Sequence, residues 1–181
     1  MSFYDVIRLQ SLYWNLRQHI FLIGILVLVS VIMSRSRKIP FIRVMAFDLA
    51  LFYLLLVIEA TVLARTSSET VMIEAELFWS WKTVIRYHDW ILLKENVLNI
   101  LMLMPIGLMV PFICDRKVGF WSGLLLGSFI SFGIEISQLL FKRGLFEWDD
   151  IIHNALGCMV GVLIGNLGIR LWRKRNTGLY I

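Results

Sequence analysis

The sequence is too apolar for a water-soluble domain of its size. Its 181 residues are 59% hydrophobic and only 17% charged, whereas ordinary soluble domains are roughly 45–50% apolar and about 25% charged. A single domain of this length could not bury so much apolar surface. High hydrophobicity with a net charge of only +5 also excludes a disordered chain. The composition therefore predicts an all-α integral membrane protein.

Neither the positive charge nor the cysteines indicate a cofactor or a nucleic-acid partner. Membrane proteins accumulate Lys and Arg in their cytoplasmic loops, which accounts for the net charge without nucleic acid. The two cysteines, Cys114 and Cys158, belong to different apolar segments, where small buried hydrophobes are expected. No disulfide, metal site or cofactor is predicted.

Five apolar segments approach the length of about 20 residues that a transmembrane helix needs. They run at about residues 14–33, 41–63, 96–113, 118–141 and 151–172. The first segment is preceded by arginines but lacks a small-residue cleavage site, so it is interpreted as a retained helix and not as a signal peptide. The sequence thus predicts a bundle of about five transmembrane helices.

Lys and Arg are unevenly shared between the two ends of this predicted bundle. Ten of the 18 fall in three short stretches, residues 35–43, 116–117 and 170–175. The positive-inside rule places these stretches in the cytoplasm. The N-terminus is therefore expected outside and the C-terminus inside, with nearly all of the acids toward the outer side.

The longest outer loop, residues 64–94, mixes aromatic and charged side chains. Such a mixture is typical of a segment that lies at the lipid headgroups. A loop that grips a ligand is the alternative interpretation.

Two acids, Asp48 and Glu59, lie inside the second predicted span. Because they are eleven residues apart, they fall on nearly the same face of a helix. Charged groups in a span are costly and need a partner. Either each is neutralised by protonation or by a neighbouring helix, or the two form a proton or cation path.

The third predicted span carries Asn99 and, further along, Pro105. Proline removes a helical hydrogen bond and clashes with the carbonyl four residues earlier, so a kink or a break is expected there. Freed backbone groups must be satisfied by protein or water. The third helix is therefore a candidate for lining a cavity.

Small residues recur every four positions in the last two predicted spans, a spacing that lets another helix approach closely. The glycines in these rows include Gly123, Gly127, Gly157, Gly161 and Gly165. The last two helices are expected to pack tightly against each other through these rows.

The densest polar cluster lies in and around the short hairpin that joins these two helices. Together with Asn99 it makes up the predicted site: Asn99, Glu135, Gln138, Arg143, Asp149, Asp150 and Asn154. The site is expected to form one polar cavity that opens outward. Arg143 is expected to pair with Asp150 or Glu135.

Other roles stay open for the same cluster. The acids could be structural, with Arg143 neutralising one of them and the others capping the last helix. Glu135 and Asp150 could also act in general acid–base catalysis. No spacing typical of a metal site supports a metal centre here.

These residues resemble the VanZ-like family of bacterial membrane proteins. Three motifs occur in the family's order: Asn99 with Pro105 and Gly107; Glu135 with Gln138; and Arg143 with Asp150, Asn154, Gly157 and Gly161. The usual aromatic residue before the proline is Leu103 here, a mild departure. The resemblance implies a VanZ-like four-helix domain at residues 41–175, preceded by an accessory helix with its basic loop (1–40) and followed by a cytoplasmic tail (176–181).

The resemblance also implies a multi-pass protein of the bacterial cell membrane. Such a protein is expected to lower susceptibility to teicoplanin and other lipoglycopeptide antibiotics, by reducing drug access or binding at the outer face of the membrane. The expected partners are membrane lipid and either the antibiotic or a cell-wall precursor. The alternatives are a membrane-embedded enzyme acting on a lipid-linked or cell-wall substrate, and a proton-coupled transporter that uses Asp48 and Glu59. A binding role is favoured over catalysis.

Overall fold

The computed structural model describes residues 40–67, 70 and 72–177, together with residues 24, 30 and 32. Within these residues the chain is mostly helical, and four helices are long and apolar enough to cross a membrane: Phe41–Leu63, Trp90–Cys114, Phe120–Leu140 and Trp148–Arg175. They correspond to the second to fifth predicted spans. The first predicted span lies almost entirely outside the described residues.

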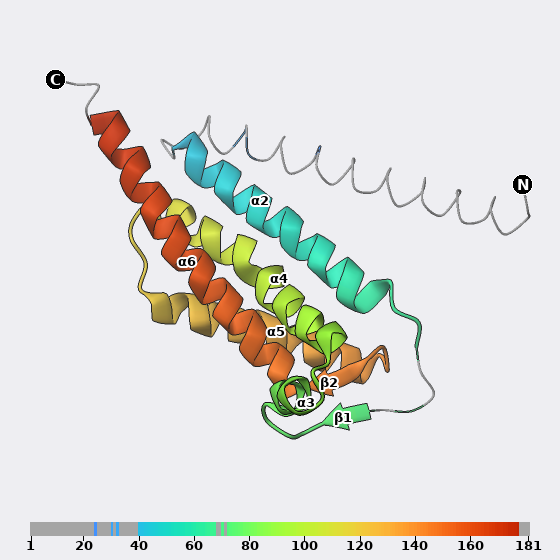
Figure 1. Cartoon of the computed structure of the whole chain (residues 1–181). Coiled ribbons are helices and arrows are strands. Elements are labelled where there is room, and N and C mark those ends of the chain that lie inside the picture. The colour runs from blue at the N-terminus through green and yellow to red at the C-terminus, as the bar shows by residue number, and fades with distance from the viewer. Residues whose placement is uncertain are drawn as a thin grey trace, which may run out of the picture.

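The four helices pack side by side in the order α2, α4, α6, α5 (Figure 1). Their bounds are Phe41–Ile58 for α2, Trp90–Cys114 for α4, Phe120–Leu140 for α5 and Trp148–Thr177 for α6. A buried apolar core forms where they meet, and it includes Val57, Leu103, Ile106, Ile134 and Cys158. Cys158 is fully buried, as expected from the sequence, whereas Cys114 is exposed.

Helix α2 ends in a π-helical turn, η1 (Glu59–Leu63). The wider turn is closed by a hydrogen bond from the Ala64 amide to the Glu59 carbonyl (2.8 Å). A helix end leaves its last carbonyls without helical donors. Gln138, near the end of α5, and Arg143, just after it, donate hydrogen bonds to carbonyls of η1, so η1 is tied to α5.

Helix α4 runs without interruption through both of its prolines, Pro105 and Pro111. Of the kink or break expected at Pro105, the break does not occur. Pro111 is buried, and Gly107 and Leu103 on the same helix are buried as well. Close packing of this part of α4 against α6 holds the helix together, although each proline removes one helical hydrogen bond.

The glycine rows have two different partners. A Cβ on Gly127 of α5 would lie 2.8 Å from the Ala155 Cα of α6, so α5 and α6 approach closely as predicted. A Cβ on Gly157, Gly161 or Gly165 of α6, however, would overlap a carbonyl of α4. The partner predicted for the α6 glycines, α5, is therefore corrected to α4. Helix α6 packs between α4 and α5. It presents its glycine row to α4, whereas the glycines of α5 meet the face of α6 that carries Ala155 and Cys158.

The long loop folds over one end of the bundle. It contains β1 (Met72–Glu74) and α3 (Trp79–Tyr87), while β2 (Leu145–Glu147) lies in the hairpin between α5 and α6. The strands pair in parallel, with Ile73 opposite Phe146. We call this end, covered by β1, α3 and β2, the capped end (Figure 1). The sequence did not predict the strands.

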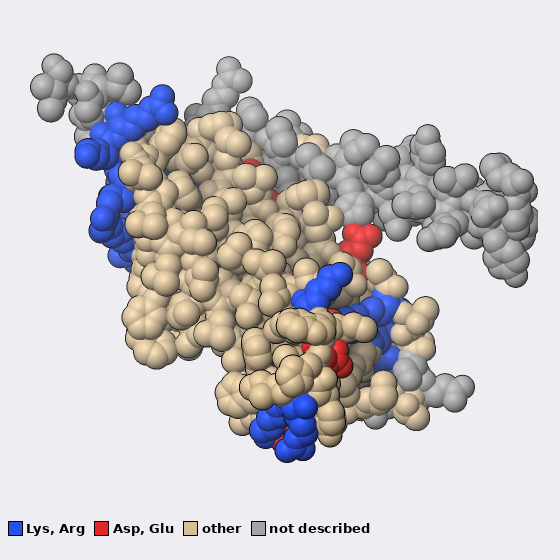
Figure 2. All heavy atoms as spheres, viewed as in Figure 1, with Lys and Arg blue, Asp and Glu red and all other residues tan. Residues whose placement is uncertain are grey.

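At the opposite end Lys and Arg outnumber the acids, and we call it the basic end. Lys and Arg gather where α6 finishes, further Lys and Arg lie beside acids at the capped end, and the surface between the two ends is largely free of charge (Figure 2). Asn166 holds the connection into α5, since its side chain accepts from the Val118 amide (2.9 Å) and donates to the Val118 carbonyl (2.8 Å). Arg173 pairs with Asp115 at 3.3 Å.

Candidate functional site

The capped end contains a polar pocket of about 300 Å³. Its wall is formed by the loop after η1, by α3, α4 and β2, and by the start of α6. The residues that line it are Arg65, Trp79, Leu92, Glu95, Asn96, Asn99, Leu145, Glu147 and Asp150. We call this cavity the capped-end pocket. Asn99 and Asp150 are the predicted site residues that lie in its wall.

A direct hydrogen bond joins these two predicted residues. The Asn99 side-chain amide on α4 donates to Asp150 Oδ1 on α6 at 2.5 Å. Asp150 belongs to the first turn of α6, where the peptide dipoles favour negative charge. The bond therefore places a carboxylate in the pocket and orients it.

Glu135 lies directly behind the wall. It is only 2% exposed, and it accepts a hydrogen bond from the Glu147 amide at 3.0 Å. Its carboxyl group interacts electrostatically with Asp150 and with Arg65. The position of β2 thus depends on a buried acid of α5.

The cation beside these acids is Arg65 and not Arg143. Arg143 donates to the carbonyls of Val62 (3.1 Å) and Leu63 (3.0 Å), so the predicted pairing of Arg143 with Asp150 or Glu135 is wrong. The guanidinium satisfies the open end of η1 instead. Arg65 is in the pocket wall and interacts electrostatically with both Glu135 and Asp150. Sequence reasoning missed Arg65, although it is the one Lys or Arg between residues 44 and 81.

Two further predicted residues lie near the pocket but outside its wall. Gln138 donates to the Thr61 carbonyl at 3.0 Å and ties α5 to η1. Asn154 donates to Ser131 Oγ at 2.9 Å and joins α6 to α5. Both side chains are buried. Their described contacts connect helices to one another.

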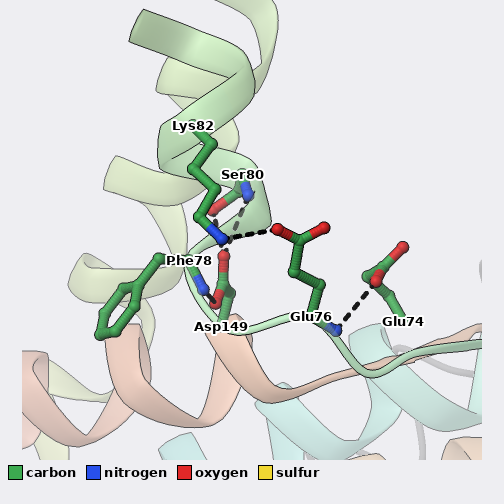
Figure 3. A network of polar contacts seen from close by, with 6 residues as sticks. All are labelled: Glu74, Glu76, Phe78, Ser80, Lys82 and Asp149. Atoms are coloured by element: carbon green, nitrogen blue, oxygen red, sulfur yellow. Dashed lines mark hydrogen bonds and ion pairs between the residues drawn. The ribbon is translucent and has the colours of Figure 1, made fainter.

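Asp149 holds α3 onto the bundle. Its carboxylate accepts from the amides of Phe78 (2.5 Å) and Ser80 (3.1 Å) and from Ser80 Oγ (2.6 Å) (Figure 3). Asp149 therefore caps the first turn of α3 rather than lining the pocket. One turn further along α6, His153 Nε2 accepts from Trp81 Nε1 at 2.7 Å. Together these contacts fix the loop that covers the pocket.

Negative charge predominates in the pocket wall. Glu95, Glu147 and Asp150 face a single guanidinium, that of Arg65. Burial raises the pKa of Glu147 to about 7, and repulsion from Asp150, Asp149 and other nearby acids adds to the effect. Glu147 therefore changes its protonation state near neutral pH.

Two buried donors in the wall have no protein partner. They are Asn96 Nδ2 and Trp79 Nε1, and the Asn96 residue is only 3% exposed. A buried donor without an acceptor costs about 1–3 kcal/mol. Sequence reasoning missed Asn96, for which the available signal was its position three residues before Asn99 on one helix face.

The two acids of the second predicted span lie away from this pocket. Asp48 accepts a hydrogen bond from Ser30 Oγ, and Glu59 begins η1. Neither lines the capped-end pocket. Among residues 40–67, 70 and 72–177, no His, Cys, Asp or Glu side chains form a group able to hold a metal ion.

A comparison with known families agrees with the motifs. The family model VanZ/LLP1 matches residues 20–169, a range that contains the pocket, every motif position and most of α6. No curated protein and no solved structure matches the chain significantly. Because the family model matches well over half of its length, the chain belongs to the VanZ/LLP1 family.

Proposed function

We propose that the protein acts in the bacterial cell envelope, where its capped-end pocket binds a polar envelope component at the outer face of the membrane. This binding lowers susceptibility to lipoglycopeptide antibiotics such as teicoplanin by reducing the access of the drug to its target. The observation that carries the proposal is the pocket itself. It combines oriented carboxylates with buried donors that lack protein acceptors.

The charge distribution supports the outward orientation of the pocket. Ten of the 18 Lys and Arg lie at the basic end or in the stretch before α2, and the positive-inside rule assigns such an end to the cytoplasm. The capped end then faces outward, toward cell-wall precursors and glycopeptides. An envelope component could reach the pocket from that side.

One observation favours an enzyme as the second candidate. A carboxyl group is best suited to general acid–base catalysis when its pKa lies near the working pH, and the pKa of Glu147 is raised to about 7. Glu147 faces the same pocket as Asp150. A membrane-embedded enzyme acting on a lipid-linked or cell-wall substrate would use this pair.

The test is a deletion strain complemented with variants of the full chain. Susceptibility to teicoplanin, surface binding of labelled drug and membrane abundance of the protein are measured together. The wild type is expected to restore low susceptibility, and Asp150→Asn to fail at unchanged abundance. Glu76→Gln is the matched control, since Glu76 lies at the same end but outside the pocket wall.

Two outcomes would contradict the proposal. Equal susceptibility of the deletion and wild-type strains would remove the link to lipoglycopeptides. Full restoration by Asp150→Asn would show that the pocket is not the site. If Asp150→Asn fails and turnover of a lipid-linked substrate is lost with it, the enzyme is favoured over the binding protein.

A further inference from the structure

The electrostatics of the capped-end pocket favour a cationic ligand. Its wall carries three carboxylates, from Glu95, Glu147 and Asp150, against the one guanidinium of Arg65. Glu135 adds a fourth acid directly behind the wall, where it accepts from the Glu147 amide. A cation placed among these groups would gain attraction that is only weakly screened in a partly buried site.

The unpartnered donors require that the same ligand also offers acceptors. Asn96 Nδ2 and Trp79 Nε1 are buried in the wall with no acceptor from the protein. An oxygen atom of a ligand would remove the cost of leaving these groups unpaired. Arg65, which also lines the pocket, offers further N–H donors for an oxyanion or a hydroxyl of the ligand. A simple cation would satisfy the carboxylates but leave these donors unpaired.

The place and size of the pocket suit a membrane-tethered headgroup. Helix α4 has 25 residues, about 37 Å at 1.5 Å per residue, and it exceeds the hydrocarbon core of about 30 Å. The first turns of α4, which line the pocket, therefore extend beyond the hydrocarbon core to the headgroup level. Trp90 and Ile91, immediately before the wall residue Leu92, are each 74% exposed, as expected for side chains at the membrane interface.

We propose that the capped-end pocket binds a headgroup that carries a primary ammonium group beside oxygen acceptors. The ammonium group lies among Glu95, Glu147 and Asp150. Its oxygen neighbours accept hydrogen bonds from Asn96, Trp79 and Arg65. A phosphoethanolamine lipid headgroup and an amino sugar both have this chemistry. The assignment rests on the proposed function in one respect, namely that the pocket binds an envelope component.

The test uses the full-length protein in phosphatidylcholine nanodiscs and two matched pairs of soluble probes. Phosphoethanolamine is compared with ethyl phosphate, and glucosamine with glucose, by calorimetric titration. At least one amine is expected to bind about tenfold more tightly than its amine-free partner, which corresponds to about 1.4 kcal/mol. Preference within the first pair indicates a lipid headgroup, and preference within the second pair indicates an amino sugar.

Variants connect the preference to the pocket. Glu95→Gln and Asn96→Leu are each expected to weaken binding of the preferred amine about tenfold, while Glu76→Gln leaves binding unchanged. Because Glu95 is exposed, its replacement is not expected to disturb folding, and thermal unfolding of each variant checks this. No amine preference in the wild type, or amine binding by both pocket variants as tight as that of the wild type, would overturn the assignment.

The result is separable from that of the proposed function. Loss of the resistance phenotype in Asp150→Asn without any amine preference would refute the ligand class and leave the proposed function standing. Amine binding by the wild type together with full restoration of low susceptibility by Asp150→Asn would refute the proposed function and leave the ligand class standing.

Discussion

The two ends of the helix bundle use their polar side chains differently. At the basic end, polar side chains are joined to backbone groups and to each other: Asn166 to both polar groups of Val118, Arg43 to the Ile113 carbonyl, and Arg173 to Asp115. At the capped end, three carboxylates and a guanidinium share a pocket wall with two donors that have no protein partner. Polar side chains fix helix termini at both ends, as Arg143 and Asp149 do at the capped end. Only the capped end adds buried wall donors that have no protein acceptor.

The most decisive experiment on this comparison asks which end faces the cytoplasm. A green fluorescent protein fused after Ile181 is expected to fluoresce, and an alkaline phosphatase fused there is expected to be inactive, because the positive-inside rule places the basic end inside. Strong phosphatase activity of that fusion would reverse the two ends and remove the outer pocket from the proposed function.

The second experiment compares one acid from each end. Asp149→Ala should destabilise the protein by at least about 3 kcal/mol, since hydrogen bonds to a charged group contribute about 1.5–3 kcal/mol each and three donors at the start of α3 lose their acceptor. Asp115→Ala breaks a more exposed ion pair and should cost no more than about 1 kcal/mol. Thermal unfolding in detergent measures both, and limited proteolysis should cleave the Asp149 variant near α3. Equal losses would contradict the difference between the ends.

The third experiment tests the contact between α4 and α6 in the part of the bundle that lies between the two ends. Gly161→Leu is expected to destabilise the protein by roughly 1–3 kcal/mol through overpacking, because a Cβ at this position overlaps the Met104 carbonyl and lies 2.8 Å from the Leu108 amide nitrogen. Gly133→Leu is the matched control, since a Cβ there has no neighbour within 4 Å. Unfolding in detergent should separate the two variants, and a Gly161→Leu variant as stable as the control would refute the α4–α6 contact.

The fourth experiment concerns a pH dependence specific to the capped end. The pKa of Glu147 is about 7 in the folded protein and 4.5 in its ordinary state. Between these two values the folded state therefore binds more protons than the unfolded state, and stability should fall as the pH rises from about 4.5 to about 7. Glu147→Gln should flatten this part of the profile, and Glu76→Gln should not. An unchanged slope in the Glu147 variant would contradict the raised pKa.

Much of the bundle could be predicted from the sequence. The positions of the second to fifth spans follow from hydropathy, which depends on neighbouring residues alone. The rows at Gly127 and Gly161 marked helix faces that approach another helix. The four-residue spacing could not name the partner, however, because a small-residue row marks only a face that another helix can approach. Only the assembled bundle decides that the α6 row meets α4 and the α5 row meets α6.

The candidate site could be predicted only in part, because several of its contacts join segments that are far apart in the sequence. Asn99 and Asp150 were expected to meet, and a hydrogen bond joins them. Arg143 was assigned to the acids because it is near them in the chain, but the open carbonyls at the end of η1 take its guanidinium. The helix start that Asp149 caps belongs to α3, about seventy residues earlier in the sequence, and hydropathy carries no information on such a contact.

The sequence by itself determined that this chain is a helical membrane protein of the VanZ/LLP1 family, with its acids collected toward one end. These properties follow from composition, hydropathy and short motifs, each of which is local. Only the tertiary structure decided that Arg65 is the cation of the pocket, that Asn96 and Trp79 bring unpartnered donors to it, and that α3 covers it. Such assignments depend on which backbone groups are already satisfied when distant segments meet, and that outcome is a property of the packed bundle alone.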